Sequence, residues 1–128
     1  MVVGNVPEAA DFVVAGAGPG GYVSSIRAAQ AGRKVLLVDP QGEDGVGGVC
    51  LRVGCIPSKT LIEAADLRHR MGRAGEMGLD NVETGFDMAR FQRFKSHVIG
   101  RLTGGVRSLL SNAGVEVVAG SLALTDNK

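Results

Sequence analysis

Two short apolar runs, residues 11–15 and 34–38, flank a segment whose apolar positions recur at helical spacing. An apolar run without alternation is typical of a parallel strand that is buried on both faces. Between the runs, Tyr22, Ile26 and Ala29 repeat with the four- and three-residue spacing of one helix face. The start of the chain therefore predicts a strand, a helix and a second strand, and we expect the first strand to be central in its sheet.

The rest of the chain predicts two long helices and a third strand. We expect a Gly-rich loop over residues 40–49, followed by a helix that Pro57 opens and that runs to Gly72. The periodic face of this helix comprises Leu61, Ala64, Ala65, Leu67 or Arg68, and Met71. Asp87 can cap the second long helix. Its apolar stripe comprises Met88, Phe91, Phe94, Val98, Leu102, Val106 and Leu109, and we expect both phenylalanines to lie in the core.

Residues 115–119 complete the pattern as a third strand. This strand should be parallel to the others because a long helical crossover precedes it. The fold class is therefore α/β, with a Rossmann-like parallel sheet and crossover helices.

The composition is that of a globular chain with an excess of glycine. Of 128 residues, 20 are glycine, about twice the usual share, while apolar residues make up 45% and charged residues 21%. A net charge of +1 and an aromatic content of 4% argue against a nucleic-acid binder. No apolar run approaches the roughly 20 residues of a membrane span, and the first basic side chain, Arg27, comes too late for a secretory signal. We therefore expect a cytoplasmic protein.

A glycine motif follows the first predicted strand and opens the first helix. Gly16, Gly18 and Gly21 form the pattern G-x-G-x-x-G. The first glycine permits a tight turn, the second lets backbone approach a pyrophosphate, and the third lets helix pack on strand. Asp39 ends the second strand, where an acidic side chain accepts hydrogen bonds from an adenosine ribose. We favour a dinucleotide site over a ligand-free turn, but the motif alone does not distinguish NAD from FAD.

Two cysteines, Cys50 and Cys55, stand five residues apart. On a regular helix this spacing advances about 7.5 Å and turns the side chains away from each other, which forbids a disulfide. Either the backbone is distorted, with Gly54 the expected place, or the thiols never join. A helix entrance and the nearby cation Lys59 favour the thiolate of Cys55. We favour a redox pair over inert thiols or a zinc site, for which the two histidines do not stand at motif spacing.

The cysteines lie inside a longer motif that carries a family resemblance. Residues 47–59, GGVCLRVGCIPSK, resemble the redox motif of the FAD-dependent pyridine nucleotide-disulfide oxidoreductases, and most resemble that of the dihydrolipoamide dehydrogenases. The LTGG segment at residues 102–105 and the strand up to Gly120 fit the same group, so the resemblance covers about residues 11–125. It implies that residues 1–128 form the N-terminal part of an FAD-binding domain, truncated before its closing strands.

The resemblance also implies roles for the motif residues. Those that bind the adenosine diphosphate half of FAD would be Gly16, Gly18, Pro19, Gly20, Gly21 and Asp39. The remaining cofactor contacts would come from Gly48 and Val49 along the pyrophosphate and flavin, Lys59 beside the flavin ring and Gly120 near the adenine. Cys55 would face the flavin as a thiolate, and Cys50 would exchange with the substrate disulfide.

By the same resemblance the parent enzyme would oxidise dihydrolipoamide. Electrons would pass through a disulfide between Cys50 and Cys55 and through FAD to NAD, the co-substrate. The implied partners are the lipoyl-bearing acyltransferase subunit of a 2-oxo acid dehydrogenase complex and a second copy of the full-length enzyme in a homodimer. The alternatives are a glutathione or mercuric reductase and a non-catalytic flavin-binding module.

Several features depart from the family pattern. Arg52 stands where an asparagine is expected, Asp39 replaces the more usual glutamate, and the segment from Asp39 to Cys50 is about two residues longer. The nicotinamide and interface domains of the family have no counterpart in these residues. His69 would lie about 21 Å along its helix from the second cysteine, and His97 is expected at the surface, so neither can serve as a base. We therefore expect the 128-residue chain alone to be inactive and to bind FAD weakly or not at all.

Overall fold

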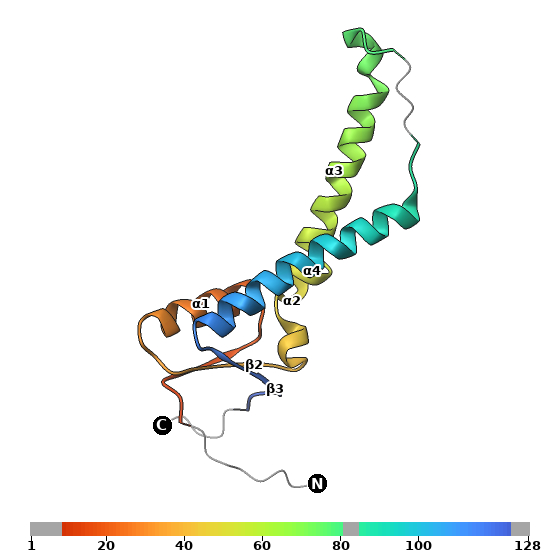
Figure 1. The fold of residues 1–128 in the computed structure, drawn as a ribbon. Helices are drawn as coiled ribbons and strands as arrows, with labels where there is room; N and C mark the ends of the chain where they lie inside the picture. Colours follow the sequence, from red (N-terminus) through yellow and green to blue (C-terminus); the bar gives the residue numbers. More distant parts are fainter. Residues whose placement is uncertain (1–8, 81–84, 124–128) are drawn as a thin grey trace. The chain divides into compact units, whose positions relative to one another are not determined.

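The computed structural model describes residues 9–80 and 85–123, and the chain divides into two compact units. One unit consists of the described residues up to Gly48 together with those from Gly105 onward, and the other of those within 49–104. The first contains a parallel sheet and the second is helical, so we call them the sheet unit and the helical unit (Figure 1). Within the described ranges, no helix combines the length and the apolar character that a membrane span needs.

Three parallel strands form the sheet in the order β1-β2-β3: β1 (Phe12–Ala15), β2 (Val35–Asp39) and β3 (Glu116–Ala119). In the register, Val13 pairs with Leu36, and Leu37 pairs with Val117. These pairings confirm the α/β class and the parallel direction of the predicted strands.

The prediction that the first strand is central is wrong. β2 is central and its four apolar residues are buried, whereas β1 lies at an edge of the described sheet with Phe12 and Val13 each 52% exposed. The apolar runs of the two strands are alike. Their order in the sheet depends on pairing with β3, which lies far along the chain, and a local run does not encode it.

α1 (Pro19–Gln30) connects β1 to β2 and packs on both strands. The buried core of the sheet unit comprises Ala17, Val35, Leu37, Val46, Leu110 and Val115. Leu110 comes from the last turn of α4 (Met88–Asn112) and is 1% exposed, whereas Leu109, the residue in the predicted stripe, is 56% exposed. Phe91, which is buried, and Leu109 are about five full helical turns apart and so share one face of α4. The face of α4 that is buried at Leu110 therefore differs from the face that is buried at Phe91, and apolar periodicity does not indicate which face another element covers.

A short 3-10 helix, η1 (Gly42–Gly45), occupies the segment that was expected to be a loop. It packs against the carboxyl ends of β2 and β3, and a Cβ on Gly42 would lie 3.0 Å from the Cβ of Ala119. The following helix, α2 (Gly48–Arg52), also begins inside the predicted loop. Such short elements show no apolar period, which explains why the pattern did not reveal them.

The helical unit contains the rest of α2, α3 (Cys55–Gly72), η2 (Ala74–Met77) and the first part of α4. The predicted cap of α4 is confirmed, because the backbone N–H of Arg90 donates to Oδ1 of Asp87 at 3.0 Å. Phe91 is 8% exposed, as expected, but Phe94 is 58% exposed and the prediction that it lies in the core is wrong. No residue of α3 is buried either. Periodicity predicts which residues share a helix face, but not whether another element covers that face.

Candidate functional site

The glycine motif forms the turn between β1 and α1. Gly16 has a φ of 89°, a conformation that favours glycine, and its N–H donates to the carbonyl of Val38 at 2.7 Å. A Cβ on Gly21 would overlap the carbonyl oxygen of Gly16, so helix and strand approach more closely than a side chain allows. By contrast, a Cβ on Gly18 would meet no described atom within 4 Å. The first glycine allows the backbone conformation of the turn, the third allows the close approach of helix to strand, and the second borders open space.

This turn leads directly into the N-terminus of α1. Gly18 precedes the helix and offers no side chain as a cap, Pro19 is the first helical residue, and the first turn contains no acidic side chain. The first N–H groups of a helix lack intrahelical acceptors and carry a partial positive charge. The N-terminus of α1 is therefore suited to an anion.

Asp39 lies beside the same turn, at the end of β2. Its Oδ2 accepts the backbone N–H of Ala17 at 2.9 Å, and its Oδ1 accepts that of Gln41 at 3.0 Å. Its backbone carbonyl accepts the N–H of Gly120 at 3.0 Å. A Cβ on Gly45 would overlap the carboxylate, so η1 also approaches this side chain closely.

The segment after η1 returns to the glycine turn. The N–H of Gly47 donates to the carbonyl of Ala17 at 2.9 Å, and a Cβ on Gly48 would lie 2.7 Å from the Cα of Gly18. The sheet unit thus brings together most of the predicted cofactor-binding residues: Gly16, Gly18, Pro19, Gly20, Gly21, Asp39, Gly48 and Gly120. The other candidate site residues, Val49, Cys50, Cys55 and Lys59, belong to the helical unit.

The cysteines lie on two successive helices of the helical unit. Cys50 is in α2 and Cys55 is the first residue of α3, with Gly54 between the helices at a φ of −113° and a ψ of −106°. This non-helical geometry confirms that the backbone departs from a regular helix at Gly54. A Cβ on Gly54 would lie 2.9 Å from the carbonyl oxygen of Val49, so the chain also folds back tightly there.

The two side chains interact electrostatically. A hydrogen bond between the Cys50 and Cys55 side chains raises the pKa of Cys50 above its ordinary value, and desolvation and the charge of Cys55 act in the same direction. The Lys59 ammonium and a backbone hydrogen bond at Cys55 partly oppose the rise. Cys50 is half-buried and Cys55 is exposed, and both are thiols in this structure. Cys50 is therefore the thiol that holds its proton more firmly than a free cysteine would.

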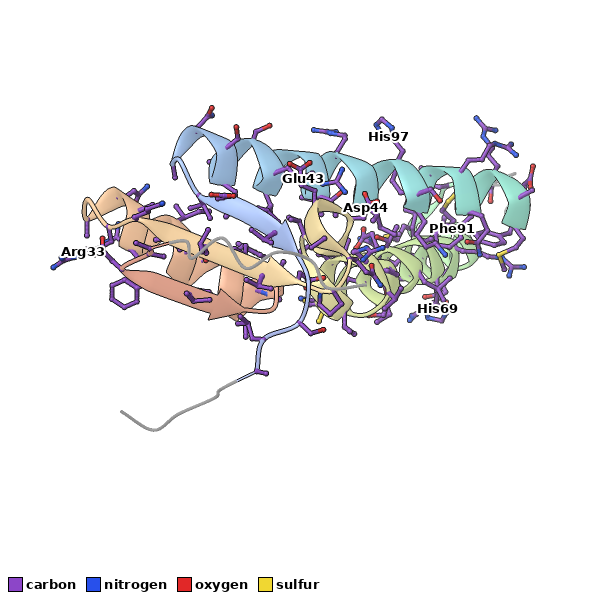
Figure 2. The ribbon with its side chains drawn as sticks, turned by 90° about the horizontal axis from the view of Figure 1, so that it is seen from below. Arg33, Glu43, Asp44, His69, Phe91 and His97 are labelled. Atoms are coloured by element: carbon purple, nitrogen blue, oxygen red, sulfur yellow. The ribbon has the colours of Figure 1, made fainter. Side chains whose placement is uncertain are left out.

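Both histidines lie on exposed helix faces. α3 is continuous from Cys55 to Gly72, which places His69 about 21 Å along the helix from Cys55. His69 borders a hollow of about 510 Å³ with Arg68 and Arg73, and His97 is exposed on α4 (Figure 2). Among the described residues, no three side chains of His, Cys, Asp or Glu gather where they could hold a metal ion.

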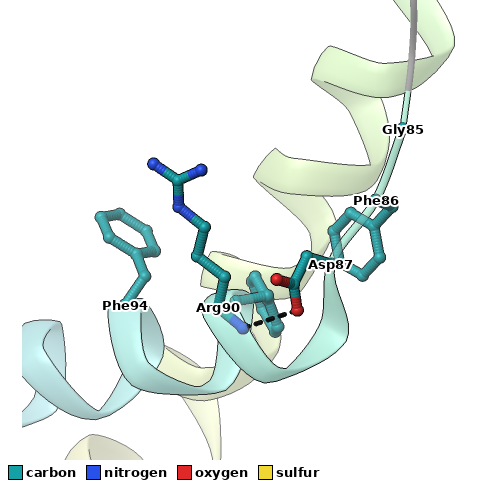
Figure 3. A pocket seen from close by; sticks show the side chains of 6 residues that line it. Gly85, Phe86, Asp87, Arg90 and Phe94 are labelled. Atoms are coloured by element: carbon teal, nitrogen blue, oxygen red, sulfur yellow. Dashed lines mark hydrogen bonds between the residues drawn. The ribbon is translucent and has the colours of Figure 1, made fainter.

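A second hollow of the helical unit lies at the start of α4. Phe86, Asp87, Arg90 and Phe94 line a space of about 610 Å³ that is open to solvent (Figure 3). The ring centroids of Phe86 and Phe91 are 5.7 Å apart. None of the predicted site residues borders this hollow.

Sequence reasoning missed Arg107, which joins α4 to η1 within the sheet unit. Its guanidinium donates to the carbonyl oxygen of Glu43 and to the carboxylate of Asp44, residues more than 60 positions away. No local sequence pattern indicates a contact over that separation, and from the sequence Arg107 cannot be distinguished from an ordinary solvent-exposed residue of the helix.

Comparison with known proteins agrees with these motifs. Residues 10–128 match the family model described as pyridine nucleotide-disulphide oxidoreductase. A dihydrolipoyl dehydrogenase of Haloferax volcanii is 46% identical over 126 residues, which cover 98% of this chain and 26% of the relative. A dihydrolipoyl dehydrogenase of Bacillus subtilis is 45% identical over 127 residues, which cover 99% of this chain and 26% of the relative. The chain spans about a quarter of the length of these curated relatives, and it belongs to the pyridine nucleotide-disulphide oxidoreductase family.

Proposed function

We propose that this chain binds the adenosine diphosphate half of FAD and carries a redox-active cysteine pair, as residues 1–128 of a FAD-dependent dihydrolipoyl dehydrogenase. The observation that carries the proposal is the meeting of Gly18, Asp39 and Gly48 around the uncapped N-terminus of α1. The relatives named dihydrolipoyl dehydrogenase support the choice of enzyme.

The residues of the sheet unit fit a dinucleotide. The N–H groups of Gly20 and Gly21 in the first turn of α1 would bind the pyrophosphate, and the missing side chain of Gly18 leaves room for it. A carboxylate has about four acceptor sites, so Asp39 can accept from a ribose hydroxyl beyond its two backbone bonds. The remaining contacts would come from Gly120 near the adenine, Gly48 and Val49 along the pyrophosphate and flavin, and Lys59 beside the flavin ring.

The cysteine pair would carry out dithiol-disulfide exchange. FAD, when bound, would supply the two-electron acceptor that reoxidises the pair. A substrate thiolate attacks the sulfur of Cys50 in the oxidised pair, which breaks the protein disulfide and releases Cys55 as a thiolate. The second substrate thiol then displaces Cys50 and leaves the substrate as a disulfide. The first substrate thiol releases its proton to solvent when the thiolate forms. Cys50 takes up the proton that the second substrate thiol loses, and its raised pKa favours that uptake.

The proposed substrate is dihydrolipoamide on the lipoyl-bearing acyltransferase subunit of a 2-oxo acid dehydrogenase complex. The full enzyme would act in the cytoplasm as a homodimer and reduce NAD. For the 128-residue chain tested alone we expect no NAD-dependent turnover. It contains one G-x-G-x-x-G motif, which we assign to FAD, so no second motif is left for NAD. Neither histidine is within reach of the cysteines as a general base, and such a base is worth about 10² to 10⁴ in rate.

Binding of ADP and FAD by the 128-residue chain tests the dinucleotide site, with Gly18→Ala as the variant and Gly75→Ala as its control. A Cβ meets no described atom within 4 Å at either position, so both variants should unfold at the wild-type temperature. Only Gly18→Ala should weaken binding, by about tenfold or more, because its methyl group occupies the approach to the pyrophosphate. Equal affinity of Gly18→Ala and the wild type would contradict the proposed site.

Thiol counting tests the cysteine pair independently of the cofactor. We expect two free thiols in the reduced, folded chain and none after mild oxidation, with a second reduction restoring both. Two free thiols that persist after oxidation, or a tightly bound zinc ion, would exclude a redox pair.

A further inference from the structure

One side chain fixes η1 to α4. Arg107 Nε donates to the carbonyl oxygen of Glu43 at 2.9 Å, and its Nη2 donates to Oδ1 of Asp44 at 3.0 Å. The Asp44 carboxylate is 84% exposed, but the guanidinium is anchored at two points, of which one is backbone. Figure 2 shows Glu43 and Asp44 beside α4. Arg107 therefore adds a fixed point on α4 to the packing of η1 against β2 and β3.

The residues after η1 lead from this anchor to the glycine turn. Gly45 ends η1 where a Cβ would overlap the carboxylate of Asp39. Val46 is 0% exposed and belongs to the core. The N–H of Gly47 then donates to Ala17. Three consecutive residues thus connect η1 to the site.

Both backbone polar groups of Ala17 are held by this arrangement. Its N–H donates to the carboxylate of Asp39 and its carbonyl accepts from Gly47. Ala17 lies between Gly16 and Gly18, so these two bonds orient the peptide groups of the turn. A shift of η1 would move Gly47 away from the carbonyl of Ala17 and would remove the close packing of Gly45 against the carboxylate that accepts the N–H of Ala17.

We propose that Arg107 is a positioning residue of the dinucleotide site. Its guanidinium holds η1 in place and thereby keeps the glycine turn in the conformation that binds a pyrophosphate. This inference rests on the proposed function, because it takes the ligand to be an adenine dinucleotide. η1 lies in the segment that joins the end of β2 to α2. Such a segment loses conformations on ordering, and a fixed point in its middle limits them.

The test uses the 128-residue chain with Arg107→Met, which keeps most of the aliphatic stem but removes the guanidinium. Arg101→Met, on an exposed position of the same helix, is the matched control. Hydrogen exchange measures the protection of the Gly47 amide without ligand, and titration measures the affinities for ADP and for adenosine. We expect Arg107→Met to lower Gly47 protection and ADP affinity each by about three- to tenfold, the scale of one exposed ion pair with a charged hydrogen bond. Adenosine lacks the pyrophosphate, so its affinity should change less.

Asp44→Asn should change both readouts in the same direction but by less, because the Glu43 carbonyl remains as an acceptor for Arg107. If the wild-type chain and Arg107→Met bind ADP with equal affinity, the role of Arg107 is overturned and the proposed function still stands. Equal losses for ADP and adenosine would also overturn it, since they indicate a general loss of structure. A wild-type chain without ADP affinity would overturn both proposals together.

Discussion

The sheet unit and the helical unit differ in how far their apolar residues are buried. Four of the five residues of β2 are buried, and Leu37 is 0% exposed. α3 is 18 residues long and buries none of them, and Leu61 and Ile62 are 47% and 64% exposed. The dinucleotide part of the proposed site therefore rests on a packed core. α3, which begins at Cys55, is not packed in a core among the described residues.

The two halves of the proposed chemistry therefore depend on different forces. Burial of apolar surface contributes about 25 cal/mol per Å², so the glycine turn is held by tertiary packing. The cysteines are held by short-range geometry at Gly54 and by each other. Substitutions in the sheet unit should therefore cost stability according to burial, and substitutions near the cysteines should change chemistry with little cost in stability.

The largest effect should come from Leu110→Ala. Leu110 is 1% exposed in the core of the sheet unit, so its truncation should lower the free energy of unfolding by about 2 to 5 kcal/mol. Leu109→Ala, on the neighbouring position at 56% exposure, and Leu67→Ala on α3, at 50% exposure, should each cost about 0.5 kcal/mol or less. Urea unfolding measures all three. A Leu67→Ala cost as large as that of Leu110→Ala would abolish the contrast between the units.

Gly21→Ala should have the next largest effect. The new Cβ would overlap the carbonyl oxygen of Gly16, and backbone must shift to relieve it, at a cost of about 1 to 3 kcal/mol. Gly20→Ala is the matched control in the same helical turn, where a Cβ meets no described atom within 4 Å. It should be neutral or slightly stabilising, because alanine favours a helix more than glycine does. Equal unfolding midpoints of the two variants would show that the close approach of α1 to β1 is not tight.

A smaller effect, of opposite sign, is expected from Ser25→Ala. Ser25 is 0% exposed, and its hydroxyl has no hydrogen-bond partner among the described residues. Removing an unsatisfied buried hydroxyl should raise the free energy of unfolding by about 1 kcal/mol. Ser24→Ala is the control, since that exposed hydroxyl donates to the carbonyl of Gly21. Both variants gain helix propensity, so a Ser25→Ala gain no larger than that of Ser24→Ala would show that burial of Ser25 carries no cost.

The sequence allowed accurate prediction of features whose signal is local. The strand, turn and helix around Gly16 to Gly21 were predictable because each glycine has a separate steric reason, and two of these reasons are visible in the structure. The Asp87 cap of α4 follows from a single residue in the same way.

Features that depend on distant segments were not predictable. β2 is central because it pairs with β3 as well as with β1, and Phe94 is exposed because no described element covers it. Asp39 illustrates the limit within the site itself. Its place at the end of β2 was predictable, but its bonds to Ala17 and Gln41 depend on the course of the chain through η1.

The smallest effect concerns the pKa of Cys50 in the helical unit. The pKa of Cys50 is raised mainly by the side-chain hydrogen bond with Cys55, which stabilises the protonated thiol. Cys55→Ala should therefore lower the pKa of Cys50. The Lys59 ammonium stabilises the thiolate, so Lys59→Met should raise that pKa further. The rate of alkylation of Cys50 by iodoacetamide, followed by mass spectrometry as pH rises, measures both shifts because only the thiolate reacts. In the reduced chain the reactive fraction should therefore appear at lower pH in Cys55→Ala and at higher pH in Lys59→Met than in the wild type, with unfolding midpoints unchanged. Shifts in the same direction would mean that general changes in burial, rather than these two neighbours, control the thiol, and the helical unit would then resemble the sheet unit after all.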